Sequence, residues 1–244
     1  MVVATGGRAL IGHIPTIFSV PTAAILAHRE EANDLALIGA WLDARGWDYV
    51  RIWREDSPTW PDVDLMIVLG SLSSVATGHC APWADHEIAQ IRTWVDAGRP
   101  YFGVCFGAQA LAAALSGSVE RMPQFFRAVT PVPWSEGSER GPWVVWHEDA
   151  ITSVGSAEVL GSLPHAILAF RHGSAWGVQA HVELDGAAVE TLARQLDASP
   201  EVWEPLAAGA RERGAELRAA TFALLDEITS GVLPQMDSNH QPFD

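Results

Sequence analysis

The feature that most constrains the fold is a cysteine flanked by glycines where a predicted strand meets a predicted helix. The stretch YFGVCFGAQ (101–109) is strand-like up to Cys105, and helix-forming ALAAAL follows directly. Such a direct passage from strand to helix is a strained turn, and Gly103 and Gly107 relieve the crowding around it. The arrangement is the cysteine version of a nucleophile elbow.

Strand-like and helix-like segments alternate through the first half of the chain. The apolar patterns predict strands at 22–28, 49–53, 64–70 and 99–105, and helices at 32–46 and 83–97. This alternation predicts an α/β fold with a central, mostly parallel sheet covered by helices on both faces. Ligands are expected at the carboxyl ends of its strands.

The second half of the chain has a different pattern. Between residues 118 and 181 we predict short strands separated by Gly, Pro and Ser turns, with the sequences SVERM, AVTPVPW, WVVWHE, AILAFRH and AWGVQAH. They indicate a small antiparallel portion, and two helices should follow at about 185–197 and 202–229. We therefore divide the chain into an N-terminal extension (1–20), one domain (21–230) and a flexible tail (231–244).

Composition excludes several classes of function. The formal net charge of −15 repels phosphate backbones and anionic lipid headgroups, so we expect neither nucleic acid nor a membrane as partner. All fifteen basic residues are arginine, which excludes a P-loop lysine and a Schiff-base lysine. We predict no cofactor and no metal.

The cysteines and the N-terminal sequence indicate a cytoplasmic protein. Cys80 and Cys105 are too few for a disulfide framework, which suits a reducing compartment. The first twenty residues are mildly apolar, but His13 and Pro15 interrupt them well short of the roughly 20 apolar residues of a membrane span. We regard Cys80 as a bystander.

Cys105 needs a histidine and an acid if it is a nucleophile rather than a packed core residue. The N-terminus of the following helix favours the thiolate, which attacks carbonyl carbon. The downstream stretch WGVQAHVEL offers His181, with Glu183 two residues further on. In an extended segment Gln179, His181 and Glu183 project to one side, so Glu183 can orient the imidazole toward Cys105.

The motif GVCFGAQAL, followed far downstream by GVQAHVE, resembles the class I (triad-type) glutamine amidotransferases. The stand-alone branch similar to the glutaminase domain of GMP synthase is closest, and the resemblance spans roughly residues 22–200. It implies a flavodoxin-like α/β sandwich that hydrolyses the side-chain amide of glutamine through a γ-glutamyl thioester. Cys105 would be the nucleophile, His181 the acid and base, and Glu183 the group that orients it.

The same resemblance implies an oxyanion hole and substrate contacts. The amide of Phe106 would be one donor, and the amide of Ser71 the other, provided that the backbone there tolerates a Cβ. Ser71 replaces the second glycine of the family's Gly-Gly-Pro loop, which here reads Gly70-Ser71-Leu72. Gly70 and Gln109 would contact the substrate.

Other departures from the family concern the substrate pocket. The segment PQFFRAV (123–129) replaces a glutamine-contact segment, and we expect Phe125-Phe126 and the tryptophans Trp134, Trp143 and Trp146 near the site. His147 resembles a family histidine, for which a structural role and a substrate contact both remain open. These aromatic residues favour an apolar leaving group.

Three functions are compatible with these residues. The first is an amidohydrolase of N-substituted γ-glutamyl amides, similar to the γ-glutamyl anilide hydrolases, and we prefer it because of the aromatic segment. The second is a glutaminase that passes ammonia to a separate synthetase partner. The third, a degenerate member that only binds a partner, is disfavoured by the complete Cys-His-Glu set.

Overall fold

The computed structural model describes residues 20–78 and 83–232. The expected extension (1–20) and tail (231–244) therefore lie almost wholly outside the described residues, as does Cys80. None of the helices in the described ranges has the length and apolarity needed to cross a membrane.

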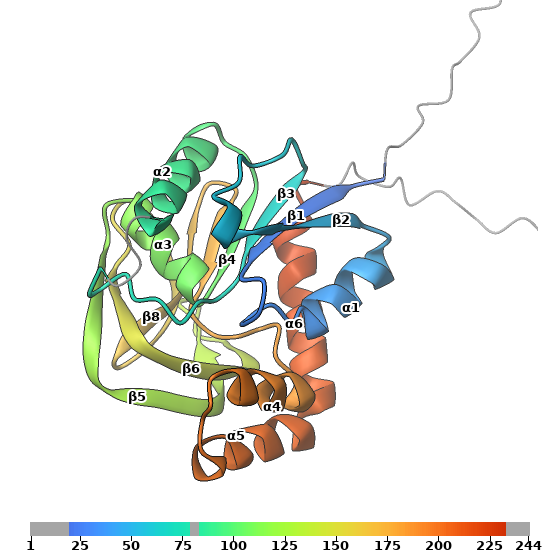
Figure 1. Ribbon diagram of the computed structural model, residues 1–244, viewed down its shortest axis with the longest axis vertical. Coiled ribbons are helices and arrows are strands. Elements are labelled where there is room, and N and C mark those ends of the chain that lie inside the picture. Colours follow the sequence, from blue (N-terminus) through green and yellow to red (C-terminus); the bar gives the residue numbers. More distant parts are fainter. Residues whose placement is uncertain (1–19, 79–82, 233–244) are drawn as a thin grey trace, which may run out of the picture.

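Seven strands of the described chain form one central sheet (Figure 1). Their order is β2-β1-β3-β4-β9-β8-β7. The bounds are Thr22–Ala27 for β1, Asp48–Trp53 for β2, Leu65–Val68 for β3, Tyr101–Val104 for β4, Glu158–Leu163 for β7, Ala166–His172 for β8 and Ala175–Val178 for β9. The first five strands in this order pair in parallel, and β8 and β7 pair antiparallel. The predicted mostly parallel sheet with a small antiparallel part is confirmed.

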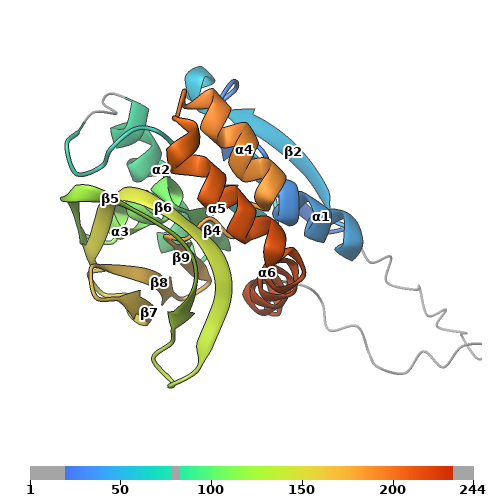
Figure 2. The same cartoon turned by 90° about the horizontal axis from the view of Figure 1, so that it is seen from below.

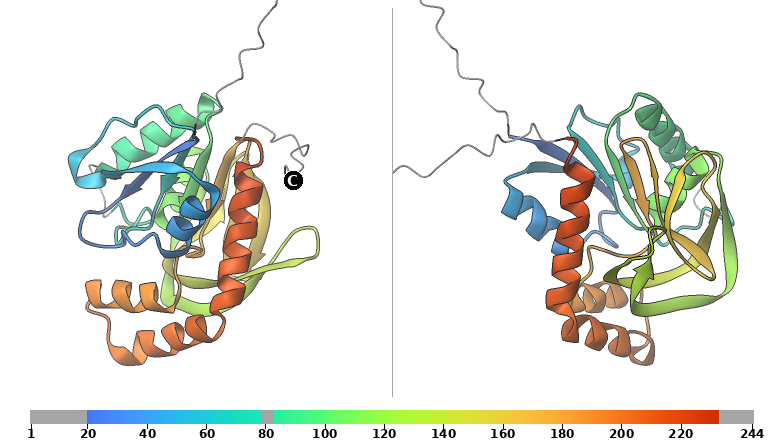
Figure 3. Two further views of the ribbon diagram at one scale, coloured as in Figure 1. Left: turned by 90° about the vertical axis from the view of Figure 1, so that its right-hand side faces the viewer. Right: turned by 180° about the vertical axis from the view of Figure 1, so that it is seen from behind.

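Helices cover both faces of the sheet because the side chains on both faces of its strands are apolar. In β1, Ala23 and Ile25 belong to a core cluster with residues of α1 (Ala36–Arg45) and α6 (Gly214–Thr229). Ala24 and Leu26 belong to a second cluster with residues of α2 (Trp83–Asp96) and α3 (Phe106–Ala114). Figure 3 shows α6 running along its face of the sheet.

A long hairpin replaces several of the short strands that we expected. β5 (Ser118–Pro133) joins the predicted segments SVERM and AVTPVPW into one strand, which pairs antiparallel with β6 (Glu139–Ser153). The pairing shifts register between Arg121 and Phe126, and Pro123, which cannot donate to a ladder, lies in that interval. A proline at a bulge is compatible with a continuous strand, so the predicted break between the two segments was wrong.

The predicted helix at 202–229 is in fact two helices. α5 (Pro200–Glu212) starts at a proline, which is favoured in the first turn, and the break falls at Arg213, just before Gly214. α4 (Gly186–Gln195) begins after Asp185, whose carboxylate accepts the amides of Ala187 and Ala188. α4 and α5 pack side by side next to the hairpin (Figure 2).

Candidate active site

Cys105 occupies the strained turn between β4 and α3. Its φ of 51° and ψ of −106° are rare for a residue with a side chain. The turn requires glycine on both sides, because a Cβ at Gly103 would lie 2.5 Å from the carbonyl of Gly107, and a Cβ at Gly107 would lie 2.2 Å from the carbonyl oxygen of Val68. The elbow expected from the sequence is therefore present, and its tight packing accounts for both glycines.

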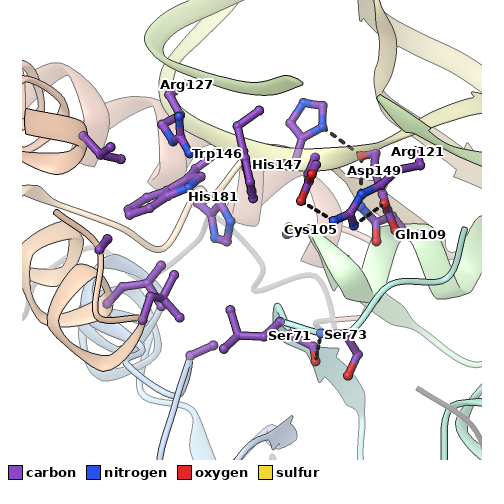
Figure 4. A pocket seen from close by; sticks show the side chains of 18 of the residues that line it. Ser71, Ser73, Cys105, Gln109, Arg121, Arg127, Trp146, His147, Asp149 and His181 are labelled. Atoms are coloured by element: carbon purple, nitrogen blue, oxygen red, sulfur yellow. Dashed lines mark hydrogen bonds and ion pairs between the residues drawn. The ribbon is translucent and has the colours of Figure 1, made fainter. Parts of the chain in front are cut away.

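The structure brings Cys105, His181 and Glu183 together. His181 follows β9 rather than ending a strand, and an isolated bridge to Val144 of β6 holds its backbone. Its Nδ1 lies 2.6 Å from Oε1 of Glu183, and its side chain hydrogen-bonds Cys105. All three residues are buried, and Cys105 and His181 lie beside each other in Figure 4.

The charges around His181 favour the imidazolium. Burial alone would lower the pKa of His181, but the carboxylate of Glu183 and then Cys105 raise it, with hydrogen bonds to both adding to the effect. The net result is a pKa well above the usual value for histidine. The site is therefore arranged to hold a proton on His181 beside the sulfur of Cys105.

Two buried glutamine side chains extend the network from the sulfur of Cys105. Gln179 Nε2 lies 3.7 Å from Cys105 Sγ, and Gln179 Oε1 lies 3.4 Å from Nε2 of Gln109. Gln109 also donates to the carbonyl of Asp149 over 3.2 Å. Gln109 thus lines the same cavity as Cys105, as expected, with its amide oriented by the protein.

The loop after β3 lies directly against the Cys-His pair. A Cβ at Gly70 would lie 3.3 Å from Cε1 of His181 and 3.7 Å from Cβ of Cys105. The φ angle of Ser71 is not positive, so the backbone tolerates its Cβ. Within the described residues, the amides of Ser71 and Phe106 have no acceptor, so both are free to donate to a ligand.

A buried ion pair, which the sequence did not predict, anchors this loop. Arg54 of the short 3-10 helix η1 (Arg54–Asp56) donates to the carbonyls of Leu69 and Gly70, over 2.7 and 2.8 Å. Its Nε lies 2.9 Å from Glu87 of α2. Its guanidinium also lies 5.2 Å from the ring centroid of Phe106, so one side chain contacts both segments that carry the free amides.

A cavity of about 380 Å³ opens above Cys105 and His181. Its walls combine Ser71 and Leu72 of the loop after β3 with side chains of β5, β6 and the α4–α5 region (Figure 4). The apolar side chains lining it are Ala32, Leu72, Phe125, Trp146, Leu192, Leu196, Ala198 and Val202. The contribution of α4 and α5 was not predicted, because neither helix carries a recognisable motif.

The expectation for the aromatic residues was only partly right. Phe125 and Trp146 line the cavity, but Trp134 and Trp143 pack together in the hydrophobic core, with ring centroids 6.3 Å apart. The ring of Phe126 contacts the ring of His165, with centroids 4.1 Å apart and the planes tilted by 32°. Alternation explains why Phe125 and Phe126 of β5 differ, since consecutive side chains of a strand point to opposite faces, and Trp143 and Trp146 of β6, three residues apart, differ for the same reason.

The side of the cavity near Gln109 is polar. Arg121 lies 3.1 Å from Asp149 and also pairs with Glu148. His147 Nδ1 donates to the carbonyl of Asp149 over 2.8 Å, and burial lowers the pKa of His147 to about 4. His147 is therefore a neutral side chain of the cavity wall at physiological pH.

The fold and the strand-elbow-helix site define a class of enzyme. A family model for class I glutamine amidotransferases matches residues 46–189, more than half of the chain. The chain belongs to this family.

A curated sequence relative agrees with this assignment, and two solved structures share the fold. GMP synthase of Brucella melitensis is 32% identical over 111 residues, an alignment that covers 38% of this chain and 22% of that enzyme. The chain thus matches about a fifth of the length of this curated relative. A glutamine amidotransferase from Thermotoga maritima superimposes with a TM-score of 0.76 at 19% identity, covering 86% of this chain and 98% of that one. A glutamine amidotransferase from Methylobacillus flagellatus superimposes with a TM-score of 0.69 at 19% identity, covering 92% of this chain and 100% of that one.

Several residues at the site were missed by sequence reasoning. His28, whose Nε2 lies 2.8 Å from Oγ of Ser71, could have been found, because it directly follows β1 and ligand-facing residues of parallel sheets gather at such strand ends. Arg54 and Glu87 carried no such indication, since a charged residue in a loop or on a helix is usually exposed.

Proposed function

We propose that this protein hydrolyses the γ-glutamyl amide bond of N-substituted glutamines through a γ-glutamyl thioester on Cys105. The Cys105 thiolate attacks the γ-carbonyl carbon, and the tetrahedral intermediate collapses as the His181 imidazolium gives its proton to the departing amine. Neutral His181 then takes a proton from water, which attacks the thioester carbonyl. The C–S bond of this second tetrahedral intermediate breaks, releasing glutamate and restoring the Cys105 thiolate beside the His181 imidazolium. The hydrogen-bonded row from Cys105 through His181 to Glu183 supports these roles.

The amides of Ser71 and Phe106 would stabilise the oxyanion of both tetrahedral intermediates. The free state of both amides supports this role, as does the contact of Gly70 with the Cys-His pair. Preorganised donors of this kind contribute roughly 100- to 1000-fold in kcat each. Gly70 and Gln109 would contact the glutamyl group, with Gln109 at the polar side of the cavity.

The apolar wall of the cavity carries the proposal for the leaving group. Leu196 and Val202 from the α4–α5 region join Phe125 and Trp146 from the hairpin. Burying roughly 100 Å² of an aryl ring there, at about 25 cal/mol per Å², would contribute about 2.5 kcal/mol, on the order of 50-fold in kcat/KM if realised in the transition state.

The test is kcat/KM of the isolated protein for glutamine and for γ-glutamyl anilide. The proposal predicts faster turnover of the anilide, and Val202→Asn should reduce the ratio of anilide to glutamine turnover. Val159→Asn is the matched control, since Val159 is an exposed valine of β7. Faster turnover of glutamine by the wild-type protein would contradict the proposed leaving group.

A second candidate is a glutaminase that delivers ammonia to a separate synthetase. The similarity to GMP synthases favours it. So does the fold of a Thermoplasma acidophilum protein described as part of a GMP synthase, which superimposes with a TM-score of 0.52 at 18% identity, covering 81% of this chain and 99% of that one. Stimulation of glutamine hydrolysis by an added synthetase would support this candidate over the first.

A further inference from the structure

A second hydrogen-bonded row of three side chains lies beside the Cys-His-Glu row. Glu55 Oε1 lies 2.8 Å from Nδ1 of His28, and Nε2 of His28 lies 2.8 Å from Oγ of Ser71. His28 is buried and follows β1, Glu55 belongs to η1, and Ser71 faces the cavity. The mechanism proposed above uses the amide of Ser71 but neither its hydroxyl nor the other two side chains.

The chemistry of the three groups fixes the direction of these hydrogen bonds. Burial raises the pKa of Glu55, but hydrogen bonds, including the one from His28, bring it below the usual value, so the carboxylate is ionised and can only accept. In the neutral ring of His28, Nδ1 therefore carries the proton, and Nε2 accepts from the hydroxyl of Ser71. Oγ of Ser71 accepts in turn from the amide of Ser73 over 3.0 Å.

The peptide unit between Gly70 and Ser71 is thereby held from two directions. Arg54 binds its carbonyl oxygen, and in a trans peptide the N–H points opposite to the C=O, so the Ser71 amide is directed away from Arg54. His28 holds the Ser71 side chain, which limits rotation of the same peptide. Arg54 and Glu55 are neighbours in η1, so one short helix supports both restraints.

We propose that His28, oriented by Glu55, is a positioning residue for the oxyanion hole: its hydrogen bond to the Ser71 hydroxyl keeps the Ser71 amide directed at the developing oxyanion. This inference rests on the proposed function, because it requires a tetrahedral intermediate on Cys105. The hydroxyl of Ser71 then has a role that a glycine at this position could not fill.

The experiment compares His28→Ala, Ser71→Ala and the double variant with wild-type enzyme, using γ-glutamyl anilide and glutamine. Each single change should lower kcat by about 10- to 100-fold and alter KM by less than about 3-fold, because the lost constraint matters in the transition state. The double variant should be no slower than the slower single variant, since both changes break one chain of contacts. His28→Gln, which keeps an acceptor for the hydroxyl, should recover part of the activity.

A transition-state analogue gives a readout that a merely structural role would not move. The γ-aldehyde of glutamate adds the Cys105 thiol and places an oxyanion or hydroxyl in the oxyanion hole. In the His28 and Ser71 variants, the affinity for this aldehyde should therefore fall by the same factor as kcat. Alkylation of Cys105 by iodoacetamide forms no oxyanion, so its rate in the same variants should stay within about 2-fold of the wild-type rate. Asp56→Asn is the matched control, because Asp56 lies next to Glu55 in η1 but pairs with the exposed Arg29.

Three results would overturn the inference: unchanged kcat in the single variants, multiplying losses in the double variant, or a loss confined to KM. If a variant does not fold, Glu55→Gln tests the inference by the same criteria. Its kcat should fall by less than that of His28→Ala. Failure of the proposed function is distinguishable, since the wild-type protein would then neither turn over these amides nor bind the aldehyde at Cys105.

Discussion

His181 is the residue on which the chemistry of the site converges. It contacts Glu183 through one ring nitrogen and hydrogen-bonds Cys105 with its side chain, in a buried setting that would by itself favour the neutral ring. The raised pKa means that the neighbouring acid and sulfur outweigh burial. An imidazolium maintained in this way can protonate a poor leaving group such as an amine.

This balance predicts a pH dependence. Because the pKa of His181 is raised, its proton should be lost only well above the usual histidine value of about 6.5, and kcat/KM should fall at alkaline pH as that proton is lost. Glu183→Gln removes the largest influence that raises this pKa, so the alkaline fall should move to lower pH. The measurement is kcat/KM against pH for both proteins. An unchanged alkaline limb in the variant would contradict the role given to Glu183.

The catalytic candidates could be predicted from the sequence because each lies in a short local motif. Cys105 is marked by its glycines, and His181 and Glu183 are two residues apart in an extended segment. The supporting residues lie far apart in the chain: Arg54 and Glu87 are 33 residues apart, and His28 and Ser71 are 43. Only the tertiary fold brings such pairs together. The position of His28 after β1 indicates a site residue, but no local pattern links it to Ser71, and none marks Arg54 or Glu87.

At the scale of elements, the elbow depends on the close approach of α3 to the neighbouring strand β3. Gly107→Ala would place a methyl group 2.2 Å from the carbonyl oxygen of Val68, a backbone atom inside the sheet. We expect a loss of about 1–3 kcal/mol or more in the free energy of unfolding. Gly214→Ala, where the Cβ meets nothing within 4 Å, should leave stability unchanged or slightly higher. Urea unfolding of both variants measures the difference, and equal midpoints would contradict this account of the elbow.

The η1 helix is joined to α2 by the buried pair of Arg54 and Glu87, whose side chains are 1% and 5% exposed. Arg54→Met should lower the free energy of unfolding by about 3–5 kcal/mol, because it leaves Glu87 buried and unpaired. Arg54→Met with Glu87→Leu should recover most of that loss. The exposed pair of Arg29 and Asp56 supplies the control, as Arg29→Met should cost less than about 1 kcal/mol. Urea unfolding is again the measurement, and a double variant as unstable as Arg54→Met would contradict the argument.

The order of elements was predictable where periodicity was regular, and less so where proline and glycine were compatible with two structures. The buried runs of β1, β3 and β4 indicate a parallel sheet because they are apolar throughout. Pro123 suggested the end of a strand, but it lies at a bulge within β5. A continuous helical pattern predicted one helix where the structure has α5 and α6, with a break at Arg213. Pairing with β6 and packing of α5 decide these cases, and neither is visible in the local sequence.

At the scale of the molecule, the cavity is assembled from parts that are distant in the chain. The sheet supplies the catalytic candidates at the carboxyl ends of β3, β4 and β9, while the β5–β6 hairpin and the α4–α5 region complete the walls. Polar groups gather near Gln109, and apolar side chains gather toward α4 and α5. A substrate with a polar glutamyl group and an apolar amine matches this division.

The most direct test of the account is the identity of the residue that becomes acylated. Protein mixed with γ-glutamyl anilide and quenched in acid during turnover should carry a γ-glutamyl group, which peptide mass spectrometry should locate on Cys105. Cys105→Ala should carry none and should release no aniline. A γ-glutamyl group on any other residue, or turnover that survives in Cys105→Ala, would contradict the central claim.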